Sequence, residues 1–128
     1  MSKIALKRDK FKRALNALEA IYQLAPGQDR VLVDATIQRF EFSFELAWKF
    51  LKDFFWEQGL ELNFPKEVIK QAFASNLIDD EALWLQMLAD RNMTSHTYDE
   101  KLADQIYEHI HRYVPALQHL LKHTKSFG

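Results

Sequence analysis

Apolar residues recur along this chain at intervals of three, four and seven positions, the spacing of one face of an α-helix. No stretch alternates apolar and polar residues as a half-buried strand does, and no glycine-rich hairpin sequence occurs. The pattern therefore predicts an all-α protein. The expected helices cover about residues 3–24, 29–59, 65–75, 79–91 and 97–122.

Residues that start and stop helices lie between these segments. Pro26–Gly27 should end the first helix, Asp29 can cap the second, Pro65 suits the first turn of the third, and Asp79 or Asp80 opens the fourth. Thr97 and Glu100 have the spacing of a capping box for the last helix. The short connections favour antiparallel neighbours, so we expect an up-and-down bundle of four to five helices, formed by one domain over residues 1–128.

The second helix carries more apolar residues than one face can hold. A single core stripe at 100° per residue contains Ile37, Phe40, Phe44, Ala47, Trp48, Leu51 and Phe55. A second set, Phe42, Leu46 and Phe50, lies off this stripe and predicts a homodimer or partner surface, unless the short third helix covers it. Along the polar side, a solvated face is expected for Glu41, Glu45, Lys49 and Asp53.

Charge and composition narrow the function classes. The net charge is -1, yet residues 1–13 carry six basic residues against one acid and residues 109–128 carry three basic residues and no acid. These ends could form a basic rim for nucleic acid, or simply be solvated helix faces. The polar start and the absence of a membrane-length apolar run favour a cytoplasmic protein without membrane contact. No cofactor motif is evident.

The segment Arg91–Tyr98 combines the groups that phosphodiester chemistry requires. Arginine offers planar donors that match phosphate oxygens, and histidine exchanges protons near neutral pH. On one continuous helix Arg91 and His96 would point about 140° apart, so a break is needed. The break is supplied by residues that form helices weakly and cap them well, namely Asn92, Thr94, Ser95 and Thr97. The free N–H groups at the start of the next helix would then favour an anion beside His96. The alternative is that both residues only cap and pair at a helix junction.

Arginine, four residues, histidine, one residue and tyrosine resemble the signature of the HEPN family. The closest similarity is to its nucleotidyltransferase substrate-binding proteins, which are encoded beside a minimal nucleotidyltransferase. Residues 39–52, RFEFSFELAWKFLK, are similar to the second helix of that subgroup. The resemblance extends over about residues 8–122.

This resemblance implies a homodimeric helical bundle whose two motifs face one cleft and cleave RNA without metal. Arg91 would hold the scissile phosphate, His96 would be the general acid and base, and Asn92 would orient the phosphate or His96. Tyr98 matches the tyrosine that a paired nucleotidyltransferase antitoxin adenylylates. Two functions follow: a ribonuclease toxin silenced by that partner, which the complete motif favours, or a non-catalytic subunit that presents a substrate to it.

Other candidate sites are weaker. His119 and His123 are four residues apart and could bind a metal, but no third ligand is evident, so no metal site is expected. The three tryptophans, Trp48, Trp56 and Trp84, could stack on bases, although packing in the core or an interface is favoured.

Overall fold

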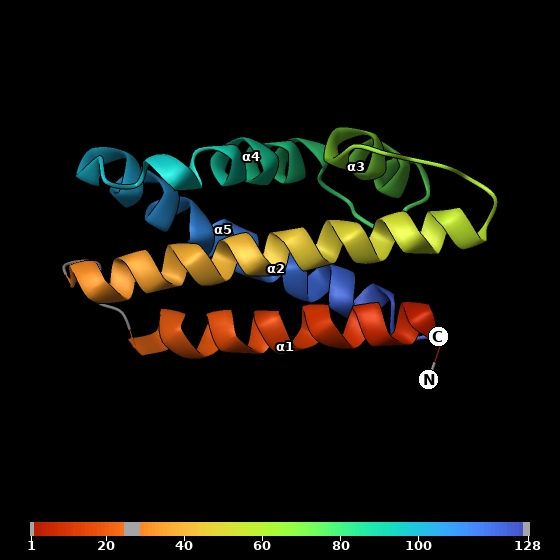
Figure 1. The fold of residues 1–128 in the computed structure, drawn as a ribbon, viewed down its shortest axis with the longest axis horizontal. Coiled ribbons are helices and arrows are strands. Elements are labelled where there is room, and N and C mark those ends of the chain that lie inside the picture. The colour runs from red at the N-terminus through yellow and green to blue at the C-terminus, as the bar shows by residue number, and fades with distance from the viewer. Residues whose placement is uncertain (1, 25–28, 127–128) are drawn as a thin grey trace.

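The computed structural model describes residues 2–24 and 29–126, and this part of the chain is all-α, without strands. The elements are α1 (Lys3–Leu24), α2 (Arg30–Glu57), α3 (Pro65–Ala74), α4 (Glu81–Asn92), the short 3-10 turn η1 (Thr94–His96) and α5 (Glu100–His123). Figure 1 shows α1 and α2 side by side, α3 and α4 following one another along α2, and α5 returning behind them. In this up-and-down bundle, the third helical position is therefore occupied by two shorter helices, α3 and α4.

The helix starts follow the local chemistry of the sequence. Asp29 accepts hydrogen bonds from the backbone N–H groups of Val31 and Leu32, and Asp80 accepts one from Leu83. Pro65 is the first residue of α3. These starts confirm the sequence prediction, because an aspartate at the N-cap satisfies N–H groups that have no partner within the helix. The predicted stop at Pro26–Gly27 lies outside the described residues.

The start of α5 corrects the sequence prediction. Asp99, rather than Thr97, is its N-cap and accepts hydrogen bonds from the backbone N–H groups of Lys101 and Leu102. The Thr97 hydroxyl instead donates to the Thr94 carbonyl at 3.1 Å. The predicted capping box is therefore wrong, because Thr97 closes the preceding 3-10 turn. Further along, α5 continues through Pro115 to His123, close to the predicted end of this helix.

The core is formed by the predicted stripe of α2, all seven residues of which are buried. Phe50, which the sequence assigned to a second surface, is also fully buried, and its ring stacks on Phe11 of α1 with centroids 6.4 Å apart. Phe42 stays 49% exposed and Leu46 is partly buried. The assignment of Phe50 to a dimer surface was wrong, since α1 lies along α2 and covers it. Of the tryptophans, Trp48 and Trp84 are buried and Trp56 is exposed.

A partly buried polar cluster joins the end of α4 to α5. The carboxylate of Asp90 accepts a hydrogen bond from the Tyr113 hydroxyl at 2.5 Å and lies 2.7 Å from His109 Nδ1. Tyr113 is fully buried and stacks on Phe40 with ring centroids 5.1 Å apart. Burial, followed by the hydrogen bond to Asp90, raises the pKa of Tyr113 well above its ordinary value. The cluster fixes the last turn of α4 against α5.

The basic start of α1 and the basic end of α5 lie at the same end of the bundle (Figure 1). Arg8 of α1 donates from Nη2 to the Leu121 carbonyl at 2.6 Å and from Nε to Thr124 Oγ1 at 3.2 Å. Burial lowers the pKa of Arg8. The end of α5 is thereby joined to α1.

Within the described segments, no helix has the length and apolar character needed to cross a membrane.

Candidate functional site at the α4–α5 corner

The corner between α4 and α5 contains the break that the sequence predicted. Helix α4 ends at Asn92, η1 turns the chain over Thr94–His96, and α5 begins at Glu100. Arg91 therefore lies in the last turn of α4, whereas His96 ends the 3-10 turn. The two side chains are free of the divergence that one unbroken helix would impose.

Arg91 points towards α2. Its Nη2 atom lies 2.8 Å from Glu45 Oε1, its Cζ atom lies 5.9 Å from the centroid of the Phe44 ring, and its side chain is 25% exposed. Lys49 Nζ lies 3.5 Å from the other oxygen of Glu45. Glu45 is thus placed between two cations.

Glu41, one helical turn before Glu45, holds the 3-10 turn. Its carboxylate accepts a hydrogen bond from the Thr94 hydroxyl, which also lies 2.8 Å from the Arg91 carbonyl oxygen. Asp53, further along α2, pairs with Lys7 of α1 at 3.4 Å. The predicted solvated face was wrong for these acidic residues, because α1 and the α4–α5 corner provide their partners. The sequence showed only the four-residue spacing of Glu45 to Lys49. The contacts of Glu41 and Glu45 with the α4–α5 corner could not be predicted from it.

His96 and Tyr98 lie together on the surface. The Tyr98 hydroxyl is 3.5 Å from His96 Nδ1, and the rings meet edge to face with centroids 6.1 Å apart. Tyr98 is 82% exposed, and Asn92 is exposed as well. Both aromatic residues precede α5, which is why two positions so close in sequence can face each other. Among the described residues, no hydrogen bond or ion pair joins Arg91 to His96.

The start of α5 does not offer the anion site that the sequence suggested. The carboxylate of Asp99 already accepts from the N–H groups of Lys101 and Leu102 and brings a negative charge to the helix end.

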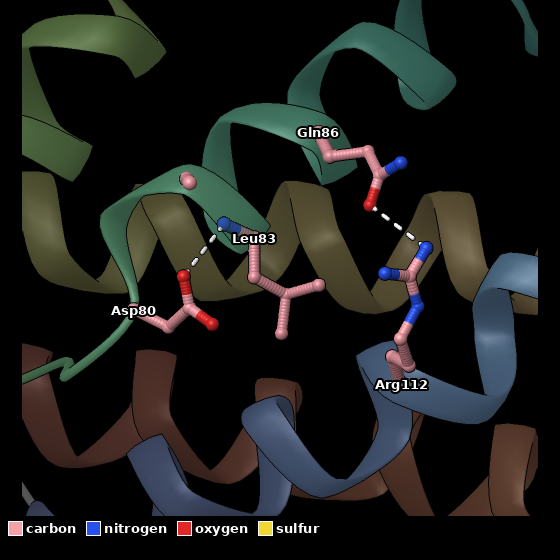
Figure 2. A pocket seen from close by; sticks show the side chains of 5 residues that line it. Asp80, Leu83, Gln86 and Arg112 are labelled. Atoms are coloured by element: carbon pink, nitrogen blue, oxygen red, sulfur yellow. Dashed lines mark hydrogen bonds between the residues drawn. The ribbon is translucent and has the colours of Figure 1, made fainter.

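Two cavities flank α4 and its corner. One of about 410 Å³ adjoins the motif and is lined by Asp34, Ala35, Ile37, Gln38, Glu41, Thr94 and Thr97. Another of about 380 Å³ lies between α4 and α5, as Figure 2 shows, where Arg112 donates to Gln86 Oε1 at 3.2 Å. The first cavity is lined by Thr94 and Thr97 of the motif segment and therefore adjoins it, whereas no residue of that segment lines the second.

His119 and His123, the pair considered as a metal site, lie close together near the end of α5. The rings of His119 and His123 lie 3.8 Å apart, and His119 Nε2 is 3.7 Å from Asp79 Oδ2. Over the described ranges, no group of three or more His, Cys, Asp or Glu residues is placed to hold a metal ion.

The chain as a whole matches a known protein family. Residues 6–126 match the family described as nucleotidyltransferase substrate binding protein like. The match covers nearly the whole chain, and the chain belongs to this family.

Similar proteins carry related descriptions. A Haemophilus influenzae Rd protein named "Probable ribonuclease HepT" is 29% identical over 100 residues, which are 74% of this chain and 68% of that protein. The crystal structure of a Thermus thermophilus protein is similar with a TM-score of 0.83 and 36% identity, over 90% of this chain and 98% of that one. The structure of HI0074 from Haemophilus influenzae, described as the fold of a substrate binding domain of a nucleotidyltransferase, is similar with a TM-score of 0.78 and 26% identity, over 91% of this chain and 97% of that one.

Proposed function

We propose that this protein is a metal-independent ribonuclease and the toxin of a toxin–antitoxin pair whose antitoxin is a minimal nucleotidyltransferase. The main support is the α4–α5 corner, where a break in the helix leaves a preoriented arginine and an exposed histidine within six residues of each other. The ribonuclease name of the Haemophilus relative agrees with this function.

The residues of the corner fit cleavage of RNA by its own 2'-hydroxyl. His96 takes the proton of that hydroxyl, and the 2'-oxygen attacks phosphorus. The bond from phosphorus to the 5'-oxygen breaks, and that oxygen leaves with a proton from a general acid. Arg91 neutralises the charge that develops on the phosphate, and Asn92, which is exposed beside it, orients the phosphate or His96. The products are a 2',3'-cyclic phosphate and a 5'-hydroxyl.

A homodimer would supply both proton-transfer groups, one from each copy. In this arrangement the two corners face one groove, and the 49% exposed Phe42 contributes to the contact between the copies. Phe50 takes no part in it, because it is buried within its own chain.

Tyr98 is the proposed site of control. Its hydroxyl is exposed and lies 3.5 Å from His96 Nδ1. Transfer of AMP from ATP to this oxygen by the nucleotidyltransferase releases pyrophosphate and leaves a bulky, negatively charged group beside the proposed general acid and base. RNA would then be excluded by steric occlusion and by charge repulsion.

The second candidate is a non-catalytic subunit that presents a substrate to a nucleotidyltransferase. One observation favours it: the charge of Arg91 is already compensated by Glu45 at 2.8 Å. In this case RNA would not be cleaved by the purified protein.

Expression of the chain alone separates the two candidates. Wild type should slow bacterial growth, and His96→Ala should abolish the effect at matched protein level, because a general acid or base contributes about 100- to 10,000-fold in rate. His123→Ala is the control, since His123 is another exposed histidine and lies at the end of α5. The purified protein should cleave RNA equally with and without EDTA. Equal toxicity of wild type and His96→Ala, or cleavage that a chelator stops and a divalent ion restores, would refute the proposal.

A further inference from the structure

The orientation of Arg91 is set by a neighbouring helix. Although Arg91 belongs to α4, its guanidinium contacts Glu45 at 2.8 Å and the ring of Phe44 at 5.9 Å, and both of these residues lie on α2. A carboxylate on one side and an aromatic face on another restrict a side chain that is otherwise long and flexible. The phosphate-binding group of the proposed site is therefore fixed before substrate arrives.

Glu45 contacts this guanidinium through one of its two carboxylate oxygens. Its contact with Arg91 is an ion pair rather than a well-aligned hydrogen bond, and the buried Arg91 Nε atom has no hydrogen-bond partner among the described residues. An arginine carries five N–H donors, so an ion pair at Nη2 leaves others for a phosphate. Lys49, at 3.5 Å from the second oxygen of Glu45, holds the carboxylate from the solvent side.

We propose that Glu45 is a positioning residue for Arg91, an inference that rests on the ribonuclease function proposed above. Glu45 has two effects of opposite sign. It fixes the guanidinium in place, which raises kcat, because a displacement of about 1 Å in a reacting geometry can cost about 100-fold in rate. It also reduces the positive charge that attracts phosphate, which raises KM. If Glu45 had only a structural role, its substitution would not change kcat and KM independently of each other.

Cleavage kinetics of the purified full-length protein test this separation with two substitutions. Glu45→Ala removes the anchor and should lower kcat about 10- to 100-fold. Glu45→Gln keeps the shape and one acceptor oxygen but loses the charge, so its kcat should fall less than that of Glu45→Ala, while removal of the negative charge should lower KM by about threefold or more. Asp53→Ala is the matched control, because Asp53 lies on the same helix and pairs with Lys7 at 3.4 Å, away from the corner. It should leave both constants unchanged.

The inference fails if Glu45→Ala and Glu45→Gln lose the same activity without a change in KM, or if both behave like Asp53→Ala. Circular dichroism checks the fold of each variant. Should Glu45→Ala not fold, the KM of Glu45→Gln decides alone, and an unchanged KM overturns the inference.

A binding assay separates this failure from failure of the proposed function. If wild type does not cleave RNA at all, the ribonuclease proposal fails, and the affinity of a single-stranded RNA for the protein is measured by fluorescence anisotropy instead. Glu45→Gln should then bind more tightly than wild type and show a steeper dependence on salt, and equal affinities would overturn the inference about Glu45.

Discussion

Removal of the Tyr113 hydroxyl tests how the last turn of α4 is held. Tyr113→Phe keeps the ring that stacks on Phe40 but deletes the 2.5 Å hydrogen bond to the carboxylate of Asp90. A hydrogen bond to a charged group contributes about 1.5–3 kcal/mol, and both partners are largely shielded from water here. We therefore expect the free energy of unfolding to fall by about 2 kcal/mol, which corresponds to a decrease in Tm of roughly 6–10 °C for a chain of this size.

Asp90→Ala should be more damaging. It removes the same hydrogen bond together with the contact to His109 Nδ1 at 2.7 Å, and it leaves a fully buried phenol without its acceptor, so the expected loss is about 3–4 kcal/mol.

Urea unfolding of the wild type, both single variants and the double variant completes a double-mutant cycle. The double variant should be more stable than additivity predicts by about 1–2 kcal/mol, because the second substitution then has no hydrogen bond left to break. A Tyr113→Phe protein within about 0.5 kcal/mol of wild type, or strictly additive effects, would refute this account of the junction.

Four further outcomes are expected. Phe50→Ala should lower the free energy of unfolding by about 3–5 kcal/mol, because it empties a fully buried site against α1, whereas Phe42→Asp should leave the fold intact and reduce the dimer fraction in light scattering. Tyr98→Phe should fold normally and gain no AMP in the mass spectrum after incubation with the nucleotidyltransferase, ATP and Mg²⁺, and modification at the wild-type level would contradict the assignment. Stability should decline above the ordinary tyrosine pKa of 10.0, because burial raises the pKa of Tyr113 in the fold and only the unfolded chain then ionises; alkaline urea titrations should show a shallower decline for Tyr113→Phe.

Local sequence by itself determined the helices and the break at the corner. Helical periodicity and capping residues act within a few positions, so the starts at Asp29, Pro65 and Asp80 were predictable. The core stripe of α2 was also predictable, since a helix that packs on its neighbours must bury its apolar face. The weak helix formers between Arg91 and His96 act locally as well, so the break between the last two helices could be predicted, and the structure contains it.

Tertiary structure alone decided which partners the side chains of α2 have. Phe50 is a core residue because α1 lies beside it, and Glu45 orients Arg91 because the third helical position of the bundle brings the end of α4 to that face. The N-cap of α5 is Asp99 rather than Thr97, because the Thr97 hydroxyl donates to the Thr94 carbonyl within the 3-10 turn. Glu41 of α2 accepts from Thr94 and holds this turn in place. Each of these outcomes depends on contacts between distant segments, whose register is set by the packing of whole helices and cannot be read from local spacing.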